Sequence, residues 1–315
     1  MASLILPTTW LPQTTAQEKA VSAFTERLRS EAECLLAHDD KWPRITIVTP
    51  TLNQARYIEH TILSVLNQGY PNLEYIILDG GSTDGTQHII DKYARYLAYW
   101  RSSPDDGQAA ALKEGFRRGS GEIFAWINSD DVYLPGVLVE VARTMTNDQG
   151  ADVCYGNMLV IDSEGRVVGE RRVTGCSNRF MYLGFRYGGL GVYQPASFWR
   201  RRAYEQVGGM DPSLNFDMDN DLFIRFVLKG SRFTFMPRSL VAFRIHDASK
   251  TFQLQDGSKS EIPMLVARYH LDQYSMKATC IRTLVRLYRG WRYLIQGDAG
   301  YLLSRLLPHR WQWVP

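Results

Sequence analysis

The chain has 315 residues, of which 45% are hydrophobic and 22% charged, and its formal net charge is +3. This composition excludes wholesale disorder and suits one large domain with appendages, or two small domains. So small a net charge gives no reason to expect a nucleic-acid partner. The four cysteines, Cys34, Cys154, Cys176 and Cys280, form no CxxC pair, which argues against a zinc knuckle or a disulfide framework and fits a reducing cytosol.

The first residues, "MASLILPTTWLPQ", have no basic region before their short apolar run and make a poor secretion signal. No stretch approaches the roughly 18 apolar residues of a membrane-spanning helix. We therefore expect a cytoplasmic protein that is soluble or peripheral on the inner face of a membrane.

The first predicted element is a helix over residues 14–39, which the proline of "KWPR" brings to an end. We interpret residues 1–43 as an N-terminal helical extension. From residue 45, short apolar runs alternate with helical patterns. Strands are predicted at 45–49, 73–79 and 122–128, and helices at 55–69, 85–97, 107–121 and 135–145, with Pro135 in the first turn of the last helix. This alternation predicts an α/β fold with a mostly parallel sheet and helices on both faces.

Beyond residue 150 the pattern becomes mixed. Helices are predicted at 197–211 and 220–230, and strands at 232–236 and 240–246. Residues 252–315 are expected to form a basic, helical tail. One face of residues 280–295 gathers apolar and aromatic side chains, Ile281, Leu284, Tyr288, Trp291 and Ile295, and another gathers Arg282, Arg286 and Arg289. Such a helix could dock on an anionic membrane surface, or pack on the catalytic domain or on a second subunit of a homo-oligomer.

Polar clusters follow three of the predicted strands. Thr49, Asp79 and the adjacent pair Asp130–Asp131 all come where a strand ends. Ligands of parallel sheets bind beyond the carboxyl ends of the strands, so we expect these clusters to converge on one edge. Two neighbouring carboxylates can form a binding site for Mg²⁺ or Mn²⁺, which prefer oxygen ligands. The alternative is a solvated turn in which one carboxylate caps the helix behind Pro135.

The loops after the first two strands could bind a nucleotide or only cap helices. "TPTLNQ" (49–54) has neither the GxGxxG of a dinucleotide fold nor a P-loop, so Thr49, Thr51 and Asn53 are left to contact a ligand or to cap. In "LDGGSTDGT" (78–86), the paired glycines let the backbone approach a ligand. We interpret Asp79 as a ligand contact and Asp84 as a helix cap, a role for which Ser82 is equally suited.

Taken together, "TPTLNQ", "ILDGGSTDGT", "DDGQAAALKEG" and "WINSDD" resemble the family 2 glycosyltransferases, whose catalytic domain has the Rossmann-like GT-A fold. The resemblance continues through residues 194–226 and 243–251. It implies a catalytic domain over residues 44–251.

The resemblance also implies roles for single residues. Asp79 would contact the base of a nucleotide-sugar donor, and further donor contacts would come from Thr49, Pro50, Thr51, Asn53, Ser82, Asp105, Gln108 and Asp130. Asp131 and His246 would hold the metal ion, with Asp130 nearer the sugar or the phosphates. Asp219 would be the general base, with Asp221 as the alternative and Asp217 as a helix cap.

These roles imply a metal-dependent, inverting glycosyltransferase that uses Mn²⁺ or Mg²⁺. A carboxylate takes the proton of the acceptor hydroxyl, and positive charge stabilises the leaving diphosphate, to which Arg244 or Lys113 could add. The expected donor is a nucleoside-diphosphate sugar, with UDP favoured, and the acceptor a glycan or a lipid- or protein-linked sugar in surface polysaccharide synthesis. Lys113 and Glu114 depart from the family pattern. The alternatives are an inactive nucleotide-sugar-binding scaffold and a sugar nucleotidyltransferase.

Overall fold

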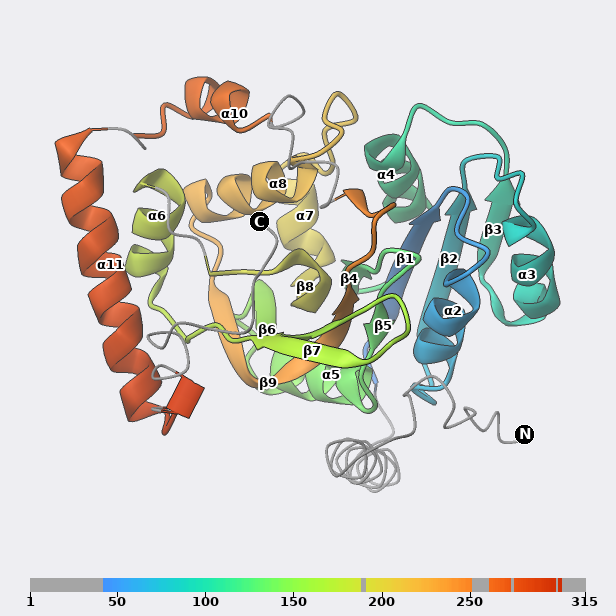
Figure 1. The fold of residues 1–315 in the computed structure, drawn as a ribbon, viewed down its shortest axis with the longest axis horizontal. Helices are drawn as coiled ribbons and strands as arrows, with labels where there is room; N and C mark the ends of the chain where they lie inside the picture. Colours follow the sequence, from blue (N-terminus) through green and yellow to red (C-terminus); the bar gives the residue numbers. More distant parts are fainter. Residues whose placement is uncertain (1–41, 188–190, 251–260, 273–274, 299, 302–315) are drawn as a thin grey trace.

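The structure is a computed structural model that describes residues 42–187, 191–250, 261–272, 275–298 and 300–301. One sheet runs through the whole described chain, in the order β3-β2-β1-β4-β8-β6-β9-β5, with β7 paired to β6 (Figure 1). Its strands are β1 (Ile45–Thr51), β2 (Leu73–Asp79), β3 (Tyr99–Ser102), β4 (Ile123–Trp126), β5 (Val132–Tyr133), β6 (Val153–Ile161), β7 (Val167–Arg171), β8 (Ser197–Arg200) and β9 (Phe233–Arg244).

The sheet has a parallel half and a mixed half. β3, β2, β1 and β4 are all parallel, as the alternating sequence pattern predicts. β8 is antiparallel to both β4 and β6, and so joins the two halves. In the second half β6 and β9 are parallel, whereas β5 and β7 are antiparallel to their partners. The mixed pattern expected beyond residue 150 is therefore confirmed.

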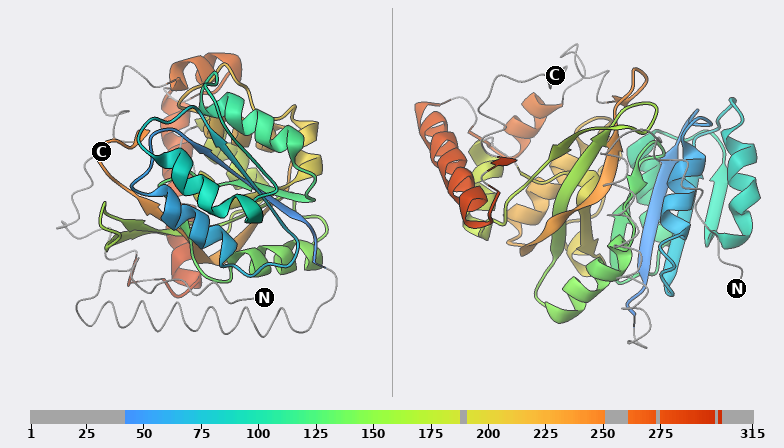
Figure 2. Two further views of the ribbon diagram at one scale, coloured as in Figure 1. Left: turned by 90° about the vertical axis from the view of Figure 1, so that its right-hand side faces the viewer. Right: turned by 60° about the horizontal axis from the view of Figure 1, so that its bottom comes forward.

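Helices cover both faces of the sheet, as Figure 2 shows from two further directions. α2, α3 and α5 contribute to one apolar core, and α4, α6, α7, α8 and α10 contribute to the other. Their bounds are α2 (Ile58–Leu66), α3 (Thr86–Tyr93), α4 (Gln108–Arg118), α5 (Val137–Asn147), α6 (Asn178–Tyr187), α7 (Arg201–Gln206), α8 (Met218–Leu228), α10 (Ile262–Arg268) and α11 (Met276–Ile295); two short 3₁₀ helices are η2 (Ala94–Tyr96) and η3 (Gln194–Ala196).

The parallel strands contribute side chains to both cores, because successive residues of a strand point to opposite faces of the sheet. Ile45 and Ile47 belong to the core under α2 and α5, whereas Val48 belongs to the core under α4. Because successive strand residues point to opposite faces, a strand covered on both faces must be apolar throughout. α4 packs closely on β1, since a Cβ at Gly115 would lie 2.5 Å from a methyl carbon of Val48. This contact sets the distance of α4, and of Gln108 at its start, from the sheet.

Three features of the structure differ from the prediction. Residues 197–200 form strand β8 instead of the start of a helix, and only 201–206 are helical. Helix α5 begins at Val137 after Gly136, whose φ is +76°, so Pro135 precedes the helix instead of occupying its first turn. The strands predicted at 232–236 and 240–246 form one strand, β9.

The described part of the C-terminal tail is helical, as predicted. α11 lies along the side of the molecule opposite β2, β3 and α3, and packs on α6 (Figure 1). Across the described ranges, no helix combines the length and hydropathy that a membrane span requires. The helix predicted at 14–39 and the last 14 residues of the tail lie outside the described residues.

Candidate active site

A pocket of about 450 Å³ lies at the carboxyl ends of the parallel strands. This volume is in the range of small-molecule sites. Its lining comes from the ends of β1 and β2, from α4 and the loop before it, from residues 128–130 after β4, from the end of β9 and from Ala248, Ser249 and Lys250. The segments that follow the three predicted strands therefore meet at one edge, and of Thr49, Asp79, Asp130 and Asp131 only Asp130 lines the pocket. Five of the predicted residues line the pocket: Pro50, Thr51, Asp105, Gln108 and Asp130.

Strand alternation decides which residues of β1 and β2 reach this pocket. Pro50 and Leu78 line it, whereas Thr49 and Asp79 are fully buried and absent from its lining. The Thr49 hydroxyl lies 3.0 Å from the hydroxyl of Tyr75. The Asp79 carboxylate accepts hydrogen bonds from the Ser82 amide (3.0 Å), the Ser102 hydroxyl (2.5 Å) and the Ser82 hydroxyl. Asp79 thus holds the loop after β2, and its predicted contact with a base stays a prediction.

Asn53 and Ser82 connect the first two loops to each other. The Asn53 amide donates to the Ser82 hydroxyl (2.7 Å), and the Asn53 side-chain oxygen accepts from the Thr83 amide (2.9 Å). Neither residue lines the pocket. Asp84 accepts hydrogen bonds from the amide and hydroxyl of Thr86, the first residue of α3, whereas the N-cap position of that helix is occupied by Gly85.

Asp105 is positioned by an arginine that sequence reasoning missed. Arg101 donates to Asp105 (3.2 Å) and to Glu114 (2.9 Å), and also to the carbonyl oxygen of Asp79 (3.1 Å). The other carboxylate oxygen of Asp105 accepts from the Gly107 amide (3.0 Å). Glu114, noted as a departure from the family pattern, therefore balances the charge of the guanidinium that holds Asp105.

The two carboxylates that follow β4 have different surroundings. Asp130 lines the pocket, and its Oδ2 lies 3.0 Å from Nε2 of His246. Asp131 is fully buried and accepts a hydrogen bond from the backbone amide of Arg244 (2.9 Å). Burial, together with the charge of Asp130, raises the pKa of Asp131 well above its ordinary value. The sequence predicts Asp131 as the metal ligand, which stays a prediction; the structure places Asp130 in the pocket lining, beside His246.

This pair suits a divalent metal ion. His246 is almost fully buried, and its ring packs on Tyr57 at a centroid distance of 4.7 Å. One carboxylate and one imidazole are ligands that Mn²⁺ accepts, and such ions commonly complete their shell with diphosphate oxygens and water. Within the described residues, no group of three or more His, Cys, Asp and Glu side chains offers a closed metal site.

The arginine and lysine expected near the diphosphate lie elsewhere. Nε of Arg244 donates to the backbone oxygen of Asp130 (2.9 Å), and Lys113 is exposed on α4; neither lines the pocket. The cation at the pocket is Lys250, which donates to the backbone oxygen of Asn215 (2.9 Å). The motif "FRIHDASKT" contains this lysine four residues after His246. This short spacing from a predicted metal ligand was the feature of the sequence that could have indicated Lys250 as a residue of the site.

Three acids at the start of α8 have separate surroundings. Asp217 is the N-cap residue, as predicted, and its carboxylate accepts from the amide of Glu261 (2.7 Å) and from the Asn220 side chain (2.9 Å). Asp219 is half-buried, and burial raises its pKa to about 6; the charge of Asp217 adds to this effect, whereas the Asn220 amide and Lys250 oppose it.

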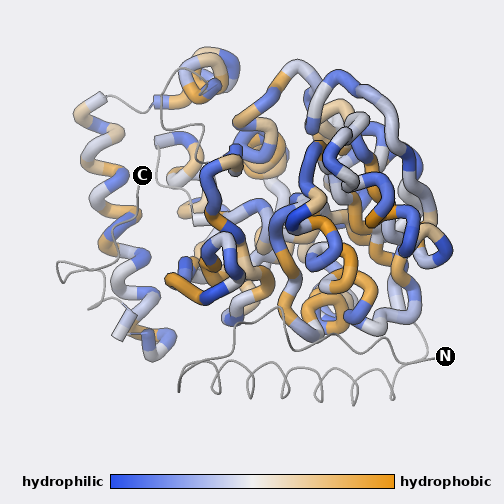
Figure 3. The backbone as a smooth tube through the Cα atoms, turned by 45° about the vertical axis from the view of Figure 1, so that its right-hand side comes forward, coloured by the Kyte–Doolittle hydropathy of each residue, from blue (hydrophilic) through white to orange (hydrophobic). Residues whose placement is uncertain are grey.

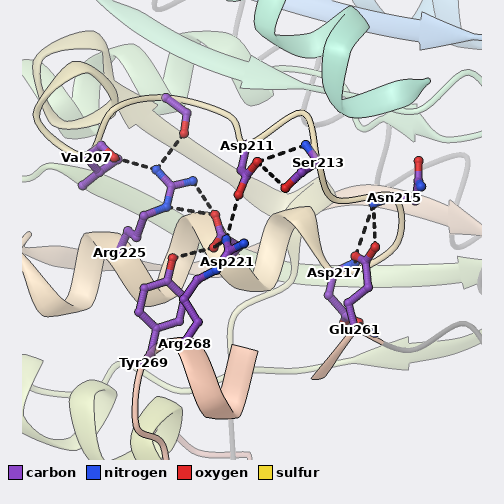
Figure 4. A network of polar contacts seen from close by, with 11 residues as sticks. Val207, Asp211, Ser213, Asn215, Asp217, Asp221, Arg225, Glu261, Arg268 and Tyr269 are labelled. Atoms are coloured by element: carbon purple, nitrogen blue, oxygen red, sulfur yellow. Dashed lines mark hydrogen bonds and ion pairs between the residues drawn. The ribbon is translucent and has the colours of Figure 1, made fainter. Parts of the chain in front are cut away.

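Asp221 is fully buried, and its carboxylate accepts four hydrogen bonds from three residues (Figure 4). Its carboxylate accepts from Arg225 through Nη2 (2.5 Å) and Nε (2.9 Å), from Arg268 (3.2 Å) and from the hydroxyl of Tyr269 (2.5 Å). These contacts tie α8 to α10 and fit a structural role for Asp221. Neither Asp219 nor Asp221 lines the pocket, and it is the structural role of Asp221 that favours Asp219 as the candidate base.

Comparisons with known proteins show the family and the fold of this chain. Residues 46–208 match the family described as glycosyl transferase family 2, and the chain belongs to that family. An uncharacterized glycosyltransferase of Rickettsia typhi is 28% identical over 217 residues, which cover 66% of each chain. One of Mycobacterium tuberculosis is 27% identical over 188 residues, which cover 59% of this chain and 70% of the relative. The chain spans about two thirds of the length of the Rickettsia typhi relative, and only 21% of another, from Rickettsia felis.

Solved structures show the same fold at low identity. TarS of S. aureus (residues 1–349), in complex with UDP-GlcNAc, is 18% identical with a TM-score of 0.52, over 65% of this chain and 60% of that one. The mannosyltransferase PcManGT of Pyrobaculum calidifontis, in complex with GDP-Man and Mn²⁺, is 16% identical with a TM-score of 0.53, over 93% of this chain and 87% of that one. The predicted GT-A fold is therefore confirmed.

Proposed function

We propose that this protein is a metal-dependent, inverting glycosyltransferase that moves a sugar from a nucleoside-diphosphate donor to a hydroxyl group. The observation that carries the proposal is Asp130, which lines a pocket together with Asp105 and Lys250 and lies 3.0 Å from Nε2 of the buried His246. A bound Mn²⁺ or Mg²⁺ would neutralise charge on the diphosphate. The favoured donor is a UDP-sugar. The acceptor is a glycan or a lipid- or protein-linked sugar in surface polysaccharide synthesis.

The residues of this chain divide the work. Asp130 and His246 would hold the metal ion, and Lys250 would face the diphosphate as a fixed positive charge. Asp105 would meet the nucleoside through its carboxylate, which can accept hydrogen bonds from a base but cannot donate them when ionised. Asp219 would accept the proton of the acceptor hydroxyl, and its pKa of about 6 leaves it ionised at neutral pH. With one base and no covalent nucleophile, attack on the far side of the sugar inverts the anomeric carbon.

We propose a cytoplasmic location, which is supported by the cysteines. The three cysteines in the described ranges, Cys154, Cys176 and Cys280, are free thiols. Free thiols are typical of reducing compartments.

A thermal-shift panel tests the proposed donor and metal. We would measure the melting temperature with UDP, GDP, CDP and dTDP, each with and without Mn²⁺, since a ligand that binds only the native state raises it by mass action. A rise for one nucleotide that requires the metal is expected, and it would name the donor class. If no nucleotide raised the melting temperature, the proposed donor site would be wrong.

Turnover separates the transferase from the nucleotidyltransferase. With the donor identified, the transferase releases a nucleoside diphosphate from the nucleotide-sugar, whereas a sugar nucleotidyltransferase releases pyrophosphate from a nucleoside triphosphate. Detection of pyrophosphate with a sugar phosphate and a triphosphate would favour the alternative. Family membership favours the release of a nucleoside diphosphate.

A further inference from the structure

Helix α11 has apolar side chains on two faces, and only one of them is buried. On the inner face Ala278, Val285 and Tyr293 are buried. Tyr288 stacks on Phe180 of α6 with ring centroids 3.8 Å apart, and the Tyr293 hydroxyl donates to the backbone oxygen of Arg172 (2.7 Å). The helix therefore packs on the catalytic domain through this inner face, where Arg282 also donates to the backbone oxygen of Tyr187 (3.3 Å).

The outer face of α11 is exposed along the whole helix. Its large apolar side chains are between 54% and 86% exposed: Met276, Leu284, Leu287, Trp291, Leu294 and Ile295. Their spacing of three, four and seven residues places them on one side of the helix. Figure 3 shows apolar segments alternating with hydrophilic ones along α11, and Figure 1 shows the helix at the edge of the molecule. Contiguous exposed apolar surface of this kind marks an interaction site.

The charge of α11 indicates what covers this face. Residues 276–295 contain no aspartate or glutamate and five basic side chains. Lys277 and Arg286 are exposed, whereas Arg282, Arg289 and Arg292 are partly buried on the side of the helix that faces the catalytic domain. Two copies of this helix packed face to face would bring the exposed Lys277 and Arg286 of both copies together without a compensating acid on either helix. An anionic surface has the complementary charge, and a membrane that contains anionic lipid accepts apolar side chains between its headgroups as well.

We propose that the outer face of α11 docks on the surface of an anionic membrane. Leu284, Leu287 and Trp291 would enter the boundary between headgroups and acyl chains, and Arg286 at the side of the stripe would meet the headgroup phosphates. The helix would then lie in the plane of the membrane, with the catalytic domain on the aqueous side. This interaction deepens the proposed function by placing the enzyme where a lipid-linked acceptor would be found. Vesicle binding requires no turnover, so the two proposals can fail separately.

The test is co-sedimentation of the full chain with vesicles. We would compare vesicles of phosphatidylcholine alone with vesicles that also contain phosphatidylglycerol. Strong binding only to the anionic vesicles is expected, and it should weaken as salt is raised because exposed charges are screened. The double variant Leu287→Ser/Trp291→Ser should bind at least about tenfold less, since two side chains no longer enter the apolar boundary.

Two further variants sharpen the test. Leu228→Ser, at an exposed leucine (47%) at the end of α8, removes a matched apolar side chain elsewhere and should leave vesicle binding unchanged. Arg286→Gln removes one exposed charge from α11 without touching its inner face, and should reduce binding to anionic vesicles alone. Circular dichroism would verify that each variant is folded.

Three results would overturn the proposal. The first is absence of binding to anionic vesicles by the folded wild-type chain. The second is a loss with Leu228→Ser as large as that with Leu287→Ser/Trp291→Ser. The third comes from light scattering: if the double variant converted a dimer into a monomer and the wild type bound no vesicles, the outer face would be an interface between two copies.

Discussion

Asp130 and Asp131 are adjacent in the sequence, yet one meets the pocket and the other meets the protein interior. Asp130 reaches His246 at the pocket wall, whereas the Asp131 carboxylate accepts a hydrogen bond from the backbone of Arg244. Sequence spacing cannot separate them, because the direction of each side chain depends on the turn after β4. The resemblance to a family identified the pair, and only the structure distinguished its members.

This difference predicts opposite effects of the same substitution. Asp130→Ala should abolish the metal-dependent rise in melting temperature with nucleotide, and should lower the apo melting temperature less than Asp131→Ala does, because Asp130 lines the pocket and Asp131 is fully buried. Asp131→Ala leaves the buried amide of Arg244 without its partner, and should cost about 1–3 kcal/mol of stability. Thermal and chemical denaturation with and without nucleotide and Mn²⁺ would measure both effects. The assignment is wrong if Asp130→Ala keeps the metal-dependent rise.

Asp219 predicts a pH dependence of activity. Because its pKa is about 6, the fraction of ionised base, and with it kcat/KM, should rise through pH 6 and level off above pH 7. Asp219→Asn should lower kcat/KM by about 10²–10⁴-fold and remove the inflection near pH 6. A profile for Asp219→Asn that kept the wild-type inflection would assign the proton transfer to another group.

The same pKa shift has a consequence for stability. The ordinary pKa of an aspartate is 3.8, so between about pH 4 and 6 the folded protein binds this proton more tightly than the unfolded chain does. This contribution is present at low pH and lost as pH rises through 6. We expect Asp219→Asn to melt at the same temperature as wild type at pH 4 and at a higher temperature at pH 8. Scanning calorimetry at the two values would decide, and a lower melting temperature of the variant at pH 8 would contradict the shift.

At the scale of elements, the loop between β3 and α4 depends on a single guanidinium. Arg101 reaches Asp105, Glu114 and the backbone of β2 together. Lysine keeps the charge but cannot reproduce this fork of donors. Arg101→Lys should therefore raise KM for the donor about tenfold while kcat changes less, since it displaces a binding contact and not the proton acceptor.

Arg118→Lys is the matched control for this prediction. Arg118 also pairs with Glu114 (2.9 Å), but contacts neither Asp105 nor the β2 backbone among its described hydrogen bonds. Steady-state kinetics of the two variants would separate them. If Arg101→Lys and Arg118→Lys raised KM equally, the increase would come from the lost contact with Glu114 and not from the displacement of Asp105.

The connection between α8 and α10 gives a prediction for stability. Asp221→Ala would leave the side chains of Arg225, Arg268 and Tyr269 without their shared acceptor. Breaking a buried ion pair by removing one partner costs about 3 kcal/mol or more. For a domain of this size the melting temperature should fall by on the order of 10 °C. If Asp221→Ala melted like wild type but lost turnover, Asp221 and not Asp219 would be the base.

Much of the element order could be predicted from the sequence. The parallel half follows from apolar runs separated by helical patterns, and its strands β1, β2 and β4 occur where they were expected. β8 was missed because "SFWR" is four residues long and runs directly into the helical pattern of α7. A short apolar run carries no period of its own, and its strand conformation comes from pairing with β4 and β6.

For the whole molecule, the pocket takes its walls from both halves of the sheet. The parallel half supplies the ends of β1 and β2 and the start of α4, and the mixed half supplies the end of β9 and the residues up to Lys250. More of the pocket residues in the parallel half could be predicted from the sequence, because the motifs there directly follow regular strands. Lys250 belongs to a segment whose position depends on how β9 crosses the sheet, and so it was overlooked.

The position of β8 between the two halves has a mechanical consequence. Its four residues pair with β4 on one side and β6 on the other, so the hydrogen-bonded lattice is continuous across the molecule. Neither half can separate from the other without breaking β8 first, and Phe198 and Trp199 lie fully buried within it. Amide exchange at β8 should therefore require global unfolding and be among the slowest in the chain. The two walls of the pocket would then behave as one rigid body, with closure around a ligand left to the loops.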